Sequence, residues 1–127
     1  MKLMIILTAA TVAFAGAAHA AEIKTSPQPA GNTVTVDSVT IDGDGWLVIH
    51  AIKNGKPVVP ASIGHVAIKS GTTENVVVKL TRATKPGEKL LPMLHVDQGY
   101  MGEYEFPGAD HPVMKDGKPV VKPLPIK

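Results

Sequence analysis

The side chains best suited to chemistry in this sequence lie in one strand-like segment and at two further histidines. Side chains alternate along a β-strand, so Met93, His95 and Asp97 would stand in one row on one face. His50 and His111 could complete the group. Imidazole suits Cu(II) and thioether suits Cu(I). The pattern therefore offers copper as the alternative cofactor, bound by ligands from these five residues.

The same residue types also have a purely structural interpretation. A His-x-Asp pair on a strand is frequently hydrogen-bonded, which fixes the imidazole tautomer and satisfies a partly buried ring. Met93 can equally fill a gap in a hydrophobic core. The first expectation is therefore a domain without a cofactor, in which His50, His95 and Asp97 form a structural network.

Serine nucleophiles are the main candidates for covalent catalysis, because the chain has no cysteine. Ser38, Ser62 and Ser70 all lie outside any Gly-x-Ser-x-Gly elbow. The lack of cysteine also excludes thiolate metal sites, such as those of blue-copper and zinc-finger proteins. No motif supplies the roles that an active site requires. The sequence predicts a protein that is not an enzyme.

A glycine-bounded segment, residues 99–108, is dense in aromatic side chains. Tyr and Met are favoured where protein surfaces recognise partners. Tyr100 and Met101 are therefore the predicted partner-binding residues. Tyr104 and Phe106 are better explained as a cover for an open end of the fold.

The elements that must position these residues are short β-strands. Residues 33–36 alternate as a half-buried strand should, and the phase slips at residues 38–41, which predicts a bulge or a change of sheet. Residues 46–52 are apolar on both faces and predict a central strand. Further candidate strands are residues 62–69, 75–80 and 90–97.

Turn signals complete the fold prediction. Residues 53–59 and 115–121 echo each other, and their Asn-Gly and Asp-Gly dipeptides suit type I′ hairpin turns at a sheet edge. Pro92 favours an edge or a bulge for its strand. With 11 prolines and 12 glycines, the chain is expected to be all-β. The predicted architecture is a small two-sheet sandwich, immunoglobulin-like or cupredoxin-like, of about seven strands.

The N-terminus predicts export. Lys2, an apolar stretch and Ala18-His19-Ala20 have the features of a secretory signal peptide, residues 1–20, cut after Ala20. Residues 21–32 are expected to be a flexible N-terminal lead-in, and residues 33–127 a single domain. The mature protein would then be periplasmic or secreted, with no stable membrane span after signal cleavage.

The charge balance limits the partners. The chain carries 13 Lys and Arg against 11 Asp and Glu, a net charge of +2, and the basic residues are scattered. That distribution predicts no nucleic acid partner. The expected partner is a protein or a small ligand in the cell envelope.

Several segments, taken in order, resemble an uncharacterised family of exported β-sandwich domains, a domain of unknown function found in archaeal surface proteins and bacterial periplasmic proteins. The segments are residues 45–50, 63–64, 71–80, 93–97 and 110–113. The resemblance implies an exported sandwich and brings no assigned reaction. His50, His95 and Asp97 match its recurrent polar positions. The leading hypothesis is an exported non-enzymatic binding or structural module, and the alternative is a periplasmic copper-binding protein.

Overall fold

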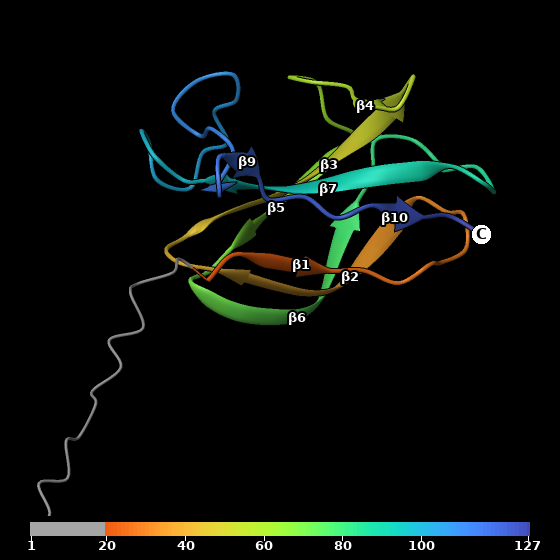
Figure 1. Cartoon of the computed structure of the whole chain (residues 1–127), viewed down its shortest axis with the longest axis horizontal. Helices are drawn as coiled ribbons and strands as arrows, with labels where there is room; N and C mark the ends of the chain where they lie inside the picture. Colours follow the sequence, from red (N-terminus) through yellow and green to blue (C-terminus); the bar gives the residue numbers. More distant parts are fainter. Residues whose placement is uncertain (1–19) are drawn as a thin grey trace, which may run out of the picture.

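The computed structural model describes residues 20–127, which form an all-β sandwich of antiparallel sheets (Figure 1). The predicted fold class is confirmed. The described residues hold ten strands where about seven were expected, because four of the strands are only two residues long. Most of the predicted signal peptide, residues 1–19, lies outside the described residues. Within residues 20–127, no helix has the length and apolar character needed to span a membrane.

The first sheet has three strands in the order β1-β2-β6. Their bounds are β1, Glu22–Lys24; β2, Thr33–Ile41; and β6, Gly71–Lys79. The predicted phase slip lies inside β2, where the buried positions change from even to odd between Val36 and Val39. Pairing with β6 is interrupted at Asp37, opposite Asn75, which has a φ of 53°. The slip is therefore confirmed, and β2 stays in one sheet.

The second sheet is built around two long neighbouring strands. Its order is β10-β7-β3-β4, and β5 also pairs with β3. The bounds are β3, Gly45–Lys53; β4, Lys56–Pro57; β5, Gly64–Ile68; β7, Lys89–Val96; and β10, Leu124–Pro125. A separate hairpin consists of β8, Met114–Lys115, and β9, Lys118–Pro119.

Both predicted hairpin turns are confirmed. Asn54 and Gly55 join β3 to β4 with φ values of 53° and 74°. Asp116 and Gly117 join β8 to β9 with φ values of 53° and 76°. Positive φ at both central residues is what a type I′ turn requires, and Asn-Gly and Asp-Gly tolerate it best. The expected edge position is confirmed for β4, which ends the β10-β7-β3-β4 path.

Pro92 does not lie on an edge strand, since β7 runs between β3 and β10. The Pro92 carbonyl accepts a hydrogen bond from the Lys122 backbone N–H at 3.2 Å. In an antiparallel strand, a residue's N and O face the same neighbour. The missing N–H of Pro92 therefore faces the C-terminal segment, where β10 is only two residues long, and not the continuous ladder with β3.

Residues 21–32 were expected to be a flexible lead-in, and the structure corrects this. The segment supplies edge strand β1, and Ile23 is buried in the core. The Gln28 side chain accepts a hydrogen bond from Thr35 N at 2.8 Å and donates one to Thr35 O at 2.9 Å. Its backbone N–H donates to Pro125 O at 3.2 Å. Gln28 therefore connects β2 of the first sheet to β10 of the second, a role that a Pro-rich composition does not reveal.

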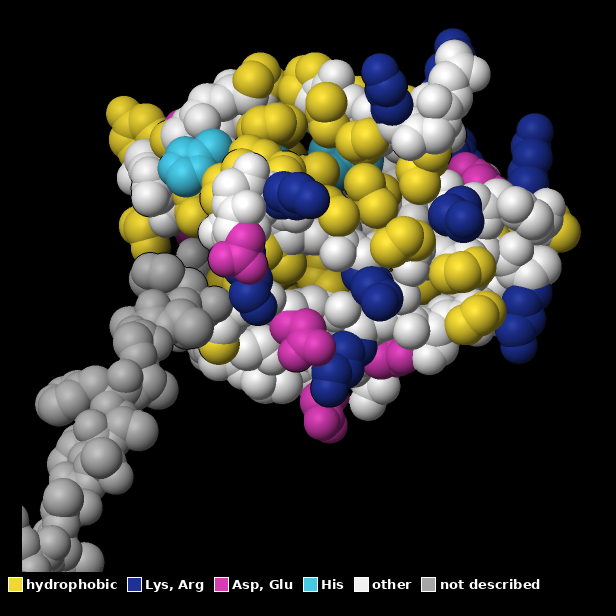
Figure 2. All heavy atoms as spheres, viewed as in Figure 1, with side chains coloured by type: hydrophobic (Ala, Val, Ile, Leu, Met, Phe, Trp, Pro, Cys, Tyr) yellow, Lys and Arg dark blue, Asp and Glu magenta, His cyan; other side chains and the backbone are white. Residues whose placement is uncertain are grey.

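The main core lies between the sheets. Leu47 and Ile49 of β3 and Leu90 and Leu94 of β7 are fully buried, and they belong to one cluster with the valines of β2 and β6. Burial of such side chains is the principal stabilising term for a domain of this size. Figure 2 shows Lys and Arg scattered over one face of the molecule, as the sequence predicts, with hydrophobic side chains gathered over its upper half.

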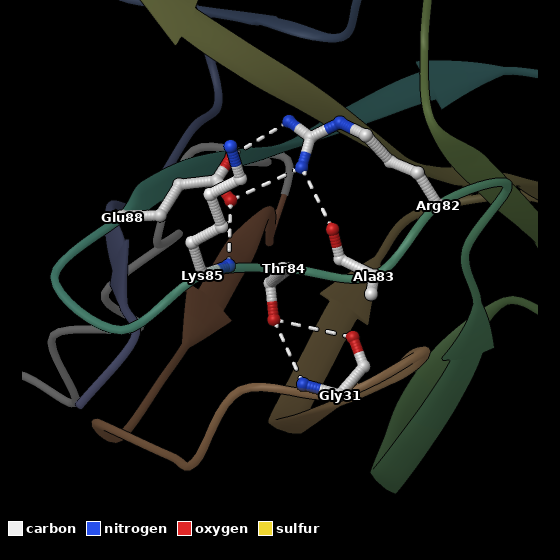
Figure 3. A network of polar contacts seen from close by, with 6 residues as sticks. All are labelled: Gly31, Arg82, Ala83, Thr84, Lys85 and Glu88. Carbon is white, nitrogen blue, oxygen red and sulfur yellow. Dashed lines mark hydrogen bonds and ion pairs between the residues drawn. The ribbon is translucent and has the colours of Figure 1, made fainter.

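A polar network fixes the crossing from β6 to β7 (Figure 3). The buried Thr84 hydroxyl accepts from Gly31 N at 3.0 Å and donates to Gly31 O at 3.2 Å. Glu88 holds the same crossing through the Arg82 guanidinium, 2.6 Å away, and Lys85 N, 3.1 Å away. The Arg82 hydrogen bond lowers the pKa of Glu88. The Thr84 contacts attach the crossing to the segment that precedes β2, and the Glu88 contacts hold the crossing itself together.

The Thr84 network predicts a loss of stability when the hydroxyl is removed. Thr84→Val keeps the side-chain shape but leaves the Gly31 N–H and carbonyl without their hydroxyl partner. We expect a loss of about 1–2 kcal/mol in the free energy of unfolding, measured by urea denaturation. The control is Thr72→Val, which removes an exposed hydroxyl hydrogen bond between Thr40 and Thr72 and should change stability by no more than about 0.5 kcal/mol. Equal losses in both variants would contradict the role of Thr84.

Candidate functional site

A second buried layer lies on the outer face of the second sheet. In the β3–β7 register, Trp46 pairs with His95 and Val48 pairs with Met93, so these side chains share one face with His50. All five are buried, yet none belongs to the core between the sheets. The apolar character of residues 46–52 on both faces thus reflects two separate buried layers.

Residues 97–113, the outer loop, cover this face. The Phe106 ring lies 4.6 Å from the His95 ring, edge to face, and Tyr104 stacks on His65 at 4.4 Å. Tyr104 also meets Trp46 at 5.6 Å. Tyr104 and Phe106 were expected to cover an open end of the sandwich, and they cover a sheet face instead. The result is a cluster of histidine and aromatic rings in which Trp46, His50 and His95 are buried beneath the partly buried Tyr104 and Phe106, while His65 lies at its exposed edge.

The two buried histidines approach each other across the sheet. Trp46 pairs with His95, and His50 lies four residues further along β3, a distance of about 13 Å along the strand. Their ring centroids are nevertheless only 5.9 Å apart. The two side chains must therefore lean toward each other over the Val48–Met93 pair that lies between them.

Backbone carbonyls orient both imidazoles. His50 Nδ1 lies 3.0 Å from Val58 O and 2.8 Å from Ala61 O, and His95 Nδ1 lies 2.8 Å from Asp110 O. A carbonyl only accepts, so each Nδ1 carries the proton and donates it. In the neutral rings, each Nε2 then keeps a free lone pair. Both Nε2 atoms are buried without a hydrogen-bond partner in the described structure.

Burial shifts the pKa of two members of the cluster, His95 and Tyr104. It lowers the pKa of His95, an effect that the Asp110 carbonyl opposes and the nearby His50 reinforces. Burial also raises the pKa of Tyr104 to about 12. At neutral pH the cluster therefore holds a neutral imidazole at His95 and a neutral phenol at Tyr104.

Asp110 closes the outer loop. Its fully buried carboxylate accepts hydrogen bonds from Gln98 N at 2.7 Å and from Glu105 N at 2.8 Å. Hydrogen bonds to a carboxylate are stronger than those between neutral groups. Because the Asp110 carbonyl also orients His95, one residue links the loop conformation to the histidine pair.

The predicted metal ligands divide into two groups. His50, His95 and Met93 share the buried outer face. Asp97 follows the end of β7, where its carboxylate accepts from Gly102 N at 3.0 Å, and exposed His111 lines a separate hollow. Within residues 20–127, no three His, Asp or Glu side chains are grouped so that they could hold a metal ion. The set is not assembled as a whole, and copper binding stays a prediction.

The predicted partner-binding residues lie at the tip of the outer loop. Tyr100 is 74% exposed and Met101 is 68% exposed. The Tyr100 backbone N–H donates to the Glu105 carboxylate at 2.8 Å. The tip is therefore fixed to the loop, while its two large side chains remain in solvent.

Sequence reasoning missed the contribution of Trp46, His65 and Asp110 to this cluster. The signal for Trp46 was present, because a strand that is apolar on both faces needs a cover on each. His65 lies opposite Val48 on β5 and thus on the cluster face, but its strand register cannot be read from spacing. Asp110 sits in a loop, where no periodicity indicates burial.

These features define a class of protein, a single all-β sandwich domain with a loop-covered histidine pair and no cysteine. The chain belongs to the family described as "Domain of unknown function (DUF7282)", whose model matches residues 21–127. The match includes β1 and Gln28, in agreement with their place in the fold.

One curated relative is "Cell surface glycoprotein 2" of Haloarcula hispanica, which is 30% identical over 90 residues. The alignment covers 71% of this chain and 9% of the relative, so the domain corresponds to a small part of that protein. No solved structure matches the chain.

The burial of His95 predicts a loss of stability in acid. The unfolded chain takes up a proton near the ordinary His pKa of about 6.5, whereas the folded state resists protonation. This contribution to stability is therefore complete above about pH 6.5 and is lost as pH falls toward the lowered pKa. With a chelator present, we expect the melting temperature of the wild type to fall as the pH is lowered from about 7.5 to 5. The fall should be smaller in His95→Asn, a variant that keeps a hydrogen-bond donor for Asp110 O. The control is His111→Asn, at an exposed histidine, whose melting temperature should fall with pH as that of the wild type does. If the melting temperature of His95→Asn depends on pH as steeply as that of the wild type, the assignment to His95 is refuted.

The role of Asp110 predicts local opening of the loop. Asp110→Ala removes the acceptor of the Gln98 and Glu105 amides, and we expect their hydrogen exchange to accelerate at least about tenfold, measured by NMR. Glu103→Ala, an exposed change in the same loop, is the control and should leave both amides protected. Unchanged exchange in Asp110→Ala would show that other contacts hold the loop.

Proposed function

We propose that the mature chain is an exported, non-enzymatic binding module of the cell envelope, located in the periplasm or outside the cell. The observation that carries the proposal is the outer loop, which is anchored in a buried cluster and presents two large side chains to solvent. The signal-like N-terminus and the similarity to part of a cell surface glycoprotein support export.

The design of the loop suits recognition. Its anchor, Asp110, is fully buried, whereas Tyr100 and Met101 at the tip are exposed. A loop that is already ordered loses less conformational entropy on binding than a mobile one. Tyr and Met are enriched in protein interfaces. A protein of the cell envelope is therefore the partner that we favour.

The experiment places a photo-crosslinking amino acid at Tyr100 in the full-length chain, expressed in its native cell. We expect one discrete adduct with an envelope protein. The matched control is the same amino acid at Val77, which is 58% exposed on β6 in the first sheet, and it should give no such adduct.

Competition tests whether the adduct reports specific binding. Added wild-type mature protein should suppress the adduct, and a Tyr100→Ala, Met101→Ala double variant should suppress it at least about tenfold less effectively, as expected when hot-spot side chains are removed. Equal suppression by both proteins, or equal crosslinking from Tyr100 and Val77, would refute the proposed binding surface.

A further inference from the structure

We propose that His50, His95 and Met93 bind one Cu(I) ion beneath the outer loop. This inference is independent of the partner-binding role, because the ligands are buried and Tyr100 and Met101 take no part in it. It also revises the ligand set expected from the sequence, since Asp97 and His111 are left out.

The first step concerns the two free nitrogens. Each imidazole donates its Nδ1 proton to a backbone carbonyl, which leaves a lone pair on Nε2 of His50 and of His95. Both rings are fully buried, and neither Nε2 has a partner in the described structure. Nearly all buried polar side-chain atoms in proteins have a partner. Trp46 Nε1 and Tyr104 OH of the same cluster also have no partner in the described structure. The two Nε2 atoms differ from the Trp46 N–H in being free acceptors, so they are open to a shared ligand that accepts electron pairs.

The surroundings of the pair are those of metal-binding histidines. A metal-ligating His almost always donates its other ring N–H to a carbonyl, a carboxylate or water, which fixes the tautomer and the ring orientation. Both His50 and His95 meet this condition. A ligand that bridges two lone pairs must accept electron density from both, which a metal cation can do.

The spacing of the rings suits one ion between them. Metal–imidazole bonds are about 2 Å long, so an ion bound to two Nε2 atoms holds the ring centroids about 5 to 6 Å apart, with the longer distance for a wide N–metal–N angle. The observed separation is 5.9 Å. Met93 lies on the same face, two residues from His95 along β7 and opposite Val48, and its side chain is buried. A thioether is therefore available as a third ligand.

The donor set selects the metal. Soft thioether sulfur favours Cu(I), imidazole is compatible with it, and hard cations prefer carboxylate, carbonyl or water oxygen. The ligands are all neutral, so an ion of charge +1 is less costly to bury than one of charge +2. Phe106 and Tyr104 cover His95 with apolar ring surface, which would keep water and oxidants from the ion.

The experiment titrates mature protein, residues 21–127, with Cu(I) under anaerobic conditions against a chromogenic Cu(I) chelator. We expect one Cu(I) per chain. X-ray absorption should show two nitrogen neighbours and one sulfur neighbour. Because Cu(I) is diamagnetic, NMR should also show a change in the Nε2 shifts of His50 and His95, while Nδ1 stays protonated.

Two variants separate the site from general copper affinity. His95→Asn keeps a donor for Asp110 O and removes Nε2, and it should lower Cu(I) affinity at least about 100-fold, as loss of a ligand does. Met93→Leu conserves volume, and it should abolish the sulfur signal and lower affinity at least about tenfold. The matched controls, exposed His111→Asn and Met101→Leu, should bind like the wild type.

Three outcomes would overturn the proposal. They are the absence of Cu(I) binding by folded wild-type protein, binding that is unchanged in His95→Asn, and Zn(II) binding that is as tight as Cu(I) binding and indifferent to Met93→Leu. Failure of the crosslinking experiment at Tyr100 would leave this proposal standing. Failure of the copper experiment would likewise leave the partner-binding proposal standing.

Discussion

The burial of two imidazoles on the outer face of the second sheet is the constraint on which the rest of this region depends. A buried ring N–H needs an acceptor, and the sheet cannot supply one because its own carbonyls belong to the ladder. The acceptors therefore come from two connections, Val58 and Ala61 for His50 and Asp110 for His95. Each connection must cross over the face to deliver its carbonyl, and in doing so it shields the rings from water.

The close packing of β3 against β7 is part of the same constraint. Gly45 begins β3 opposite Val96, and a Cβ at this position would lie 2.3 Å from the His95 carbonyl oxygen. Only glycine fits such an approach. The Asp-Gly-Asp-Gly turn of residues 42–45 indicates where β3 begins. The need for glycine at position 45, however, arises from the neighbouring strand β7.

Local patterns in the sequence predicted the structural features that depend on residues close together in the chain. Alternation, the Asn-Gly and Asp-Gly turns and the doubly apolar stretch at residues 46–52 were sufficient for the sandwich and for the row of Met93 and His95. The row did not extend to Asp97 as a third ligand, because Asp97 follows the end of β7 and its carboxylate accepts a hydrogen bond from Gly102 N in the outer loop. Contacts between segments that are far apart in the sequence, such as Gln28 with Pro125 or Asp110 with His95, carry no periodic signal and could not be predicted.

The buried histidine pair and the exposed tip belong to one mechanical unit because they share Asp110. Its carbonyl orients His95 on β7, and its carboxylate holds both Gln98 and Glu105. Glu105 in turn accepts from the Tyr100 N–H, so four residues form a continuous chain of hydrogen bonds from the sheet face to the loop tip. A displacement of the His95 ring must move the Asp110 carbonyl or lose its hydrogen bond. The loop that presents Tyr100 therefore shares its anchor, Asp110, with the His95 ring.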